Sequence, residues 1–241
     1  LFLFLFSFQS INAADVTGVK ITSEVAHHFQ SHFTDFEVYE ISTDEWLSAL
    51  GNDPQVSLDL GGDETWHLVM YPNSVFSNDY VAWAHTPEGS QRITEHPEVT
   101  YDGFTADGRD LRMSIADDFI YGVIREGEDV VYIEPVSRIM QEDNNNRFVV
   151  YRASAVVPNP DLVCGHTETK ERTNHSPEEV LRLLDTSTGT TTCRKVEIAQ
   201  AYDTGMQSRY GSNANLSTWN AAIWNVVLSL IHISEPTRHR R

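Results

Sequence analysis

The sequence predicts an α+β protein, in which a mostly antiparallel β domain is followed by the strand and helix that begin a second, α/β domain. Three observations predict this organisation. Short runs that alternate apolar and polar residues recur between residues 56 and 155, with turn residues between them. A polar segment with one well-capped helix follows at residues 158–192. A strand-like run and a helix-like run then occupy residues 193–227.

In the β domain, residues 15–157, each expected strand has one apolar face. The runs 56–60 and 66–70 place apolar side chains at alternate positions and stop at Gly61-Gly62 and Tyr71-Pro72. A short helix is expected at 44–50, capped by Thr43 or Asp44. Further strands are expected at 79–85, 98–104, 111–116, 119–125, 129–134 and 147–155, with turns at 107–108 and 126–128 and candidate core residues at Phe29, Phe33, Phe36, Val38, Tyr39 and Ile41.

The chain changes character after Val157. A helix is expected at 176–185, because Ser176 suits an N-cap, Pro177 suits the first helical position and Glu179 completes a capping box. The Thr- and Ser-rich run 186–192 reads as a linker. A strand at 195–201 and a helix at 216–227 are expected beyond it.

Charge and the terminal segments indicate an exported protein that does not bind nucleic acid. The 241 residues carry a net charge of −18, from 35 acidic and 17 basic residues, whereas nucleic-acid binding needs a basic surface. The Leu- and Phe-rich start is too short for a membrane span and is followed by Ala13 and Ala14, so residues 1–14 are interpreted as the end of a signal peptide of a secreted protein. Residues 228–241 look like a translated sequencing adapter and are left out of the fold prediction.

Three segments, taken in order, resemble the reprolysin, or adamalysin-like, branch of the metzincin zinc metalloproteases. They are residues 101–125 with Tyr132-Ile-Glu-Pro-Val136, then Leu162-Val-Cys-Gly165, then residues 194–203, 210–211 and 219–227. The resemblance implies that residues 15–157 are the propeptide of a secreted zinc metalloendopeptidase precursor and that residues 193–227 are the truncated start of its catalytic domain. The implied partners are the protein's own catalytic domain and, for the full-length enzyme, polypeptide substrates.

The resemblance also implies that Cys164 is a cysteine switch. A thiolate in the fourth coordination position of a catalytic Zn²⁺ excludes the water that the reaction needs. Gly165 would let the backbone approach the metal closely. Two other roles remain open for Cys164, namely a disulfide to Cys193 or to a cysteine elsewhere, and a buried inert thiol.

The zinc ligands of the resemblance are not in this chain, because none of its ten histidines is followed directly by Glu, as a His-Glu-x-x-His motif requires. The chain is therefore expected to be inactive as it stands. Glu197 is similar in position to a glutamate that helps to bind Ca²⁺ in some reprolysins. His28 and His32, four residues apart, would share a helix face and could bind a metal, or they form a solvated histidine cluster.

The alternative function is that of an exported, non-enzymatic, β-rich binding protein. Asp117-Asp118 and Glu142-Asp143 are expected in solvated turns rather than as a catalytic acid pair, because adjacent strand residues point to opposite faces. Asn174 and Asn215 fit the glycosylation sequon.

Overall fold

The computed structural model describes residues 14–21, 26–61, 65–93, 99–140, 146–159 and 200–234, with side chains of the last range described as far as residue 227. The chain divides into two units. The first joins the residues up to Val157 with those from Thr204 on, and it contains the described helices and strands. The second, Pro158–Asp203, is described at residues 158–159 and 200–203, which form neither helix nor strand.

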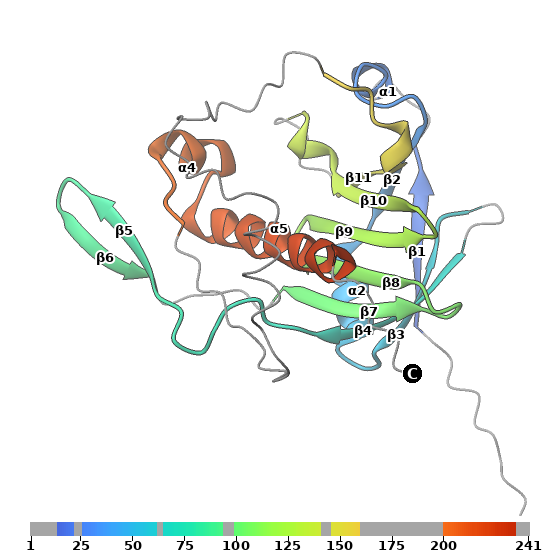
Figure 1. The fold of residues 1–241 in the computed structure, drawn as a ribbon, viewed down its shortest axis with the longest axis horizontal. Coiled ribbons are helices and arrows are strands. Elements are labelled where there is room, and N and C mark those ends of the chain that lie inside the picture. The colour runs from blue at the N-terminus through green and yellow to red at the C-terminus, as the bar shows by residue number, and fades with distance from the viewer. Residues whose placement is uncertain are drawn as a thin grey trace, which may run out of the picture. The chain divides into compact units, whose positions relative to one another are not determined.

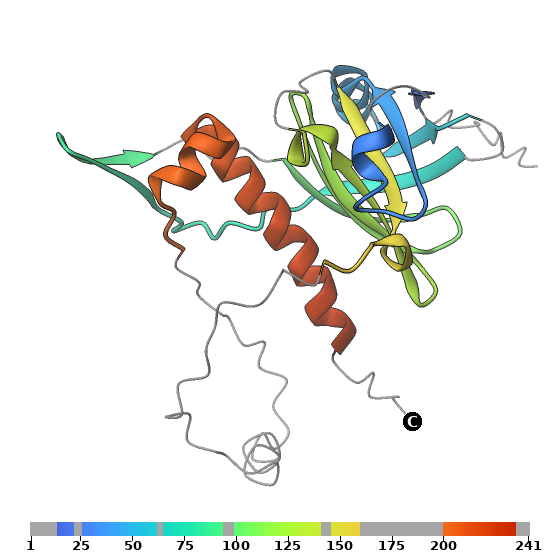
Figure 2. The ribbon, with the colours of Figure 1, turned by 90° about the horizontal axis from the view of Figure 1, so that it is seen from above.

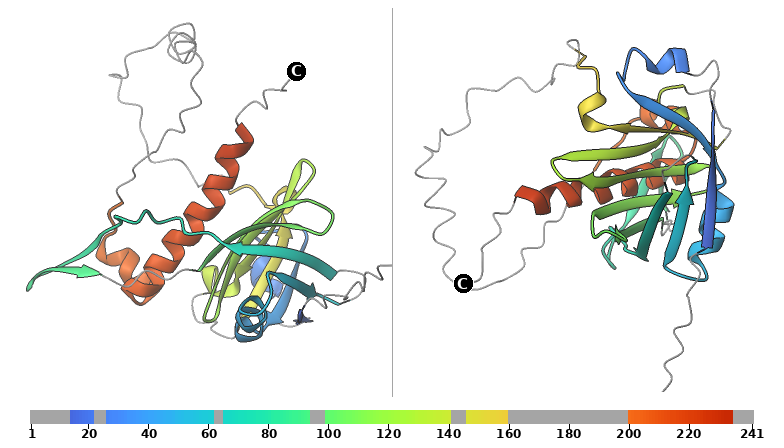
Figure 3. Two further views of the ribbon diagram at one scale, coloured as in Figure 1. Left: turned by 90° about the horizontal axis from the view of Figure 1, so that it is seen from below. Right: turned by 90° about the vertical axis from the view of Figure 1, so that its right-hand side faces the viewer.

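Nine strands of the first unit form a closed barrel (Figure 1). Their order around the barrel is β1-β2-β11-β10-β9-β8-β7-β4-β3, and Figure 3 shows the same sheet from two further sides. Neighbouring strands pair antiparallel except β1 and β3, which close the barrel in parallel with Ala14 opposite Val56 and Thr17 opposite Asp59. The barrel strands are β1 (Ala14–Lys20), β2 (Phe36–Ile41), β3 (Gln55–Asp59), β4 (Thr65–Pro72), β7 (Thr100–Thr105), β8 (Asp110–Ala116), β9 (Phe119–Glu126), β10 (Asp129–Pro135) and β11 (Arg147–Arg152).

The expected α+β fold is wrong, because the structure is mostly β, with a closed barrel and few helices. The expectation depended on a second, α/β domain that opens with a strand at 195–201. The described end of that run, Gln200 and Ala201, is in no strand, and residues 195–199 lie outside the described residues. The helix expected after it packs on the outside of the barrel instead of forming a second layer with a sheet of its own.

The local predictions within the β domain are mostly confirmed. The alternating runs at 56–60 and 66–70 are β3 and β4, and β7 to β11 lie at the places where the alternation predicts them. Gly108 and Gly127 have φ angles of 84° and 62° in the expected turns, a conformation that glycine adopts without strain. The expected short helix is α2 (Thr43–Leu50), but its N-cap is Ser42, whose Oγ accepts from the Glu45 N–H at 3.2 Å.

Inward-facing side chains fill the barrel with one apolar core. The side chain of Trp46, which is 0% exposed, comes from α2 and is part of this core. A Cβ on Gly122 would lie 2.3 Å from the Sδ of Met113, so the absence of a side chain on β9 leaves the space that Met113 occupies. The core comprises Val16, Tyr39, Ile41, Trp46, Ala49, Val56, Leu58, Leu60, Trp66, Leu68, Met70, Leu111, Met113, Ile115, Ile120, Ile124, Val131, Ile133, Phe148 and Val150.

Two further apolar clusters lie on the outside of the barrel. One joins β2, β10 and β11 to the short helices α1 (Ala26–Phe29) and η1 (Val136–Arg138), and contains Phe29, Phe33, Val38, Val136, Val149 and Tyr151. η2 (Ala153–Ala155) follows β11 directly. The other cluster joins β9 to the C-terminal helix and is described in the next subsection.

The C-terminal part of the first unit is helical. It consists of α4 (Thr204–Tyr210) and α5 (Asn213–Ser234), so the helix expected at 216–227 is confirmed and is longer than expected. Figures 1 and 2 both show α5 alongside β8 and β9. Among the described helices, none has the length and apolar character that crossing a membrane requires. The remaining strands, β5 (Ala82–Thr86) and β6 (Gly89–Ile93), form a separate two-stranded hairpin.

Candidate helix-binding face of the barrel

The outer side of β9 is an apolar surface that the sequence pattern itself produces. Phe119, Tyr121 and Val123 point outward, while Ile120 and Ile124 point into the core. All residues from Phe119 to Ile124 are buried, so β9 is covered on both sides. A strand with one solvated face would alternate, whereas this one reads as a continuous apolar run. That run was the signal in the sequence that another element covers the outer face.

Helix α5 covers this surface with an apolar stripe of its own. Trp219, Ala222 and Val226, spaced three and four residues apart, pack against the outward side chains of β9. The Trp219 ring meets the Phe119 ring edge-on at 5.0 Å and lies 5.5 Å from the Tyr121 ring. Edge-on aromatic contacts of this kind fix the orientation of the helix in addition to burying apolar surface area. We call Phe119, Tyr121 and Val123, with Ser114 of β8, the helix seat.

The buried amide of Asn225 fixes the depth and register of α5 on the seat. Asn225 is 1% exposed, and its Nδ2 donates to the carbonyl oxygens of Tyr101 at 3.1 Å and Met113 at 3.0 Å. It also lies 3.4 Å from the Oγ of Ser114, which is fully buried below the helix. Tyr101 and Met113 face each other across β7 and β8. A one-turn shift of α5 would remove the donor from both carbonyls and leave a buried amide without partners.

Next to the seat lies a buried ionic network that sequence analysis missed. Glu134 is 1% exposed, forms an ion pair with Arg138 and accepts a hydrogen bond from the Tyr151 hydroxyl at 2.6 Å. The Arg138 guanidinium lies over the Tyr121 ring, 5.8 Å from its centre, and so links the network to the seat. The Arg138 carbonyl accepts from the Nη2 of Arg209 in α4 at 3.2 Å, so the network also contacts the helical segment directly.

Burial and the neighbouring Glu134 carboxylate shift the pKa values of the residues in this network. Burial, and then the charge of Glu134, raises the pKa of Tyr121 to about 12. The same two causes raise the pKa of Tyr151. Burial lowers the pKa of Arg138, but the charge of Glu134, the neighbouring Tyr121 and the hydrogen bond to Glu134 together outweigh burial, so the net pKa is raised. Both tyrosines therefore stay neutral throughout the physiological range, and the Tyr151 hydroxyl remains a donor to Glu134.

The structure does not place the two predicted metal-binding residues, because Cys164 and Glu197 lie outside the described residues, as do His166, Glu142, Asp143 and Asn174. The His28–His32 pair does not form on a helix, because α1 ends at Phe29 and His32 lies in the turn that follows. Within the described ranges no three His, Cys, Asp or Glu side chains come together as a metal site.

The remaining sequence-predicted features are in ordinary surroundings. Asp117-Asp118 form the turn between β8 and β9, as expected, with Asp118 at a φ of 53°. Asn215 of the sequon lies in the first turns of α5, and its Nδ2 donates to the Tyr210 carbonyl at 3.0 Å. A comparison with models of known protein families finds no match to this chain, and a comparison with curated proteins finds none either.

Proposed function

We propose that the barrel is the propeptide domain of a secreted zinc metalloendopeptidase precursor, and that it holds the chain segment following it and keeps the enzyme latent. The observation that carries the proposal is the seating of α5 on the barrel. The helix belongs to the segment that the sequence resemblance assigns to the protease, and its apolar stripe and its buried amide both find partners on the barrel wall.

The seat suits the work of an intramolecular chaperone. An amphipathic helix that meets water with Trp219, Ala222 and Val226 exposed is liable to aggregate. The barrel precedes the helix in the chain, so it is synthesised first and presents a finished surface when the helix emerges. Because Asn225 contacts main-chain carbonyls, the barrel recognises one position of the helix rather than any apolar surface.

Latency in this proposal depends on Cys164, which lies between the barrel and α4 in the sequence. Its thiolate would take the zinc coordination position that catalysis reserves for water. The described residues do not supply a zinc ligand set, so we assign the barrel a binding and positioning role and derive no chemical step through the metal. Calcium binding through Glu197 is a further part of the same proposal.

The test uses the purified chain as an inhibitor of a reprolysin-type zinc endopeptidase, assayed on a quenched fluorescent peptide. The proposal expects inhibition by the wild-type chain, loss of inhibition by at least tenfold in Cys164→Ser, and full inhibition by the matched control Cys193→Ser. Alkylation and mass spectrometry should find Cys164 as a free thiol. A disulfide between the two cysteines, or equal inhibition by both variants, would contradict the switch.

A second candidate is the exported, non-enzymatic, β-rich binding protein. It is favoured by the fact that, among the described residues, barrel side chains and carbonyls supply the contacts of α5 with the helix seat, and these contacts use neither Cys164 nor a metal. This candidate expects no protease inhibition by the wild-type chain. It expects instead that the barrel binds amphipathic helices with a buried amide at the Asn225 position, which a titration with peptides can measure.

A further inference from the structure

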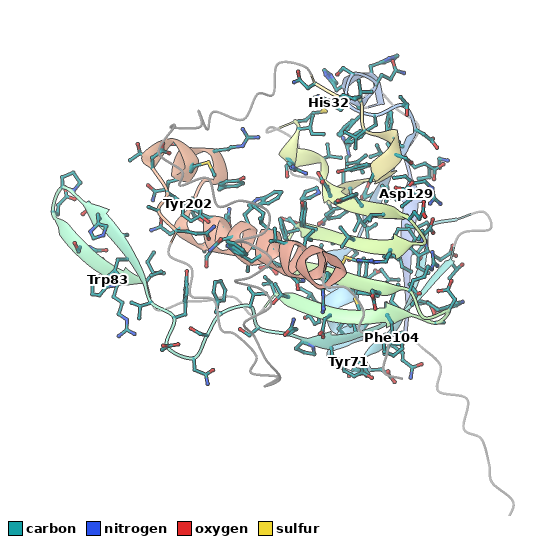
Figure 4. The ribbon with its side chains drawn as sticks, viewed as in Figure 1. His32, Tyr71, Trp83, Phe104, Asp129 and Tyr202 are labelled. Carbon is teal, nitrogen blue, oxygen red and sulfur yellow. The ribbon has the colours of Figure 1, made fainter. Side chains whose placement is uncertain are left out.

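The β5–β6 hairpin stands apart from the barrel wall in Figures 1 and 2, and its two strands pair with each other and with no other described strand. It carries Trp83, which is 55% exposed and is labelled on the hairpin in Figure 4. A hairpin of two strands without a packed face is marginally stable in water. The hairpin therefore gains from a third strand or a further surface.

The outer edge of β5 presents a defined set of main-chain groups. Thr86 and Gly89 flank a two-residue loop, so they form the hydrogen-bonded pair that closes the hairpin. Alternation then turns the N–H and C=O groups of Ala82 and Ala84 toward β6 and those of Trp83 and His85 toward the open edge. The His85 side chain is held on the Trp83 face, with its Nδ1 2.8 Å from the Oγ of Ser90.

We propose that β5 is an interaction edge for a second copy of this chain, and that two β5 strands pair antiparallel about a twofold axis at Ala84. This register brings Trp83 opposite His85 of the second copy, and both residues have their main-chain groups on the open edge. Each of these two symmetric pairs exchanges two hydrogen bonds, and each stacks an indole against an imidazole on the same face. The result is a four-stranded sheet built from two hairpins.

The β5 edge can pair with a second β5 edge because it carries no Asp, Glu, Lys or Arg side chain. The β5 sequence is Ala-Trp-Ala-His-Thr, without the charged side chains and prolines that protect sheet edges from such pairing. The other edge of the hairpin belongs to β6 and carries Arg92, which would face Ser90 of a second copy and bring two like charges into one small sheet. β5 is therefore the edge that pairs.

The net charge of the molecule determines how the dimer depends on salt concentration. Each copy carries a net charge of −18, and two such bodies repel each other at low ionic strength. Salt screens this repulsion over about 8 Å at physiological ionic strength. The dimer should therefore strengthen as salt is added, whereas a contact made by ion pairs would weaken. This inference is independent of the proposed protease function, since it uses neither the helix seat nor Cys164.

The experiment is sedimentation equilibrium of the full chain at concentrations up to about 0.5 mM, because contacts this small are weak. The wild-type mass should rise from 27.3 kDa toward twice that value, more so at high salt. Ala84→Lys places two lysines beside the twofold axis and should keep the protein monomeric. Gln91→Lys, directly opposite on β6 and on the same face, adds the same charge away from the axis and should dimerise as the wild type does.

Hydrogen exchange gives a second readout at residue level. The amides of Trp83 and His85 should exchange more slowly as the concentration rises, while those of Ser90 and Arg92 on the β6 edge should not change. The inference is overturned if the wild type stays monomeric at every concentration and salt, if Ala84→Lys dimerises like the wild type, or if the β6 amides are the ones protected. Both lysine variants keep the barrel intact, because the hairpin pairs with no barrel strand.

Discussion

Asn225 holds α5 on the barrel through contacts whose energy can be estimated bond by bond. Its Nδ2 donates to the Tyr101 and Met113 carbonyls at 3.1 and 3.0 Å, whereas the 3.4 Å approach to the Ser114 Oγ is too long to count. Each of the two good hydrogen bonds contributes about 1 kcal/mol net. Asn225→Ala should therefore weaken the attachment of α5 by about 2 kcal/mol.

Asn225→Ala leaves neither carbonyl oxygen without a hydrogen-bond donor, so no desolvation cost is added to the two lost hydrogen bonds. Ile115 donates to the Val99 carbonyl at 2.8 Å, which makes Val99 and Ile115 a hydrogen-bonded pair of the β7–β8 ladder. The alternation of antiparallel pairing makes Tyr101 and Met113 the next such pair. Both carbonyls therefore keep a ladder hydrogen bond when the Asn225 amide is removed.

Native-state hydrogen exchange followed by mass spectrometry measures this attachment directly. A loss of about 2 kcal/mol should speed exchange of the α5 amides by about 30-fold, because 1.4 kcal/mol corresponds to a factor of ten. The barrel strands should keep their protection. Ile223→Ala is the matched control, since Ile223 is in the same helix but 42% exposed. If the two variants exchange alike, or if the barrel loses protection together with α5, the assignment of Asn225 as the residue that fixes the helix is refuted.

Two further predictions concern the barrel. Gly103→Ala should lower the free energy of unfolding in urea by about 3 kcal/mol or more, because a Cβ at residue 103 would lie 1.9 Å from the Val69 carbonyl oxygen. The control Gly51→Ala should change the free energy of unfolding little, because no atom lies closer than 3.5 Å to a Cβ at residue 51. Similar urea midpoints for the two variants would contradict this prediction. Because the pKa of Tyr121 is raised to about 12 in the folded protein, the neutral phenol stabilises the fold fully below about pH 10, and that contribution is lost as the pH rises through 12. Tyr121→Phe should therefore lose less stability than the wild type between those two pH values in urea titrations, and an unchanged pH dependence would count against the burial of this hydroxyl.

The elements that sequence analysis predicts well are those whose signal is local. The runs that became β3 and β4 alternate apolar and polar residues, and the turns at Gly108 and Gly127 need a positive φ that glycine supplies. The helix at 216–227, now part of α5, was predicted from a run rich in Trp, Ala, Ile and Val. Each of these signals lies within about ten residues of the element that it predicts.

The features that sequence analysis missed depend on residues far apart in the chain. β1 and β2 were not predicted as strands, yet both complete the sheet, and the parallel pairing of β1 with β3 closes it. No local pattern distinguishes a closed barrel from an open sheet with the same strands. The burial of Glu134 likewise depends on Arg138 and Tyr151, which supply the counter-charge and the hydrogen bond that make it tolerable.

The sequence by itself determined the strands β3, β4 and β7 to β11, the helical nature of α5, the acidic charge and the two cysteines on which a switch could depend. Tertiary structure alone decided that the strands close into a barrel, and that the outward aromatic residues of β9 face α5 rather than water. The physical reason is that alternation tells which side chains are apolar on each face, but not which distant surface will bury them. Which surface covers an apolar face depends on the whole chain, because burial of that face is favourable against any surface that fits it.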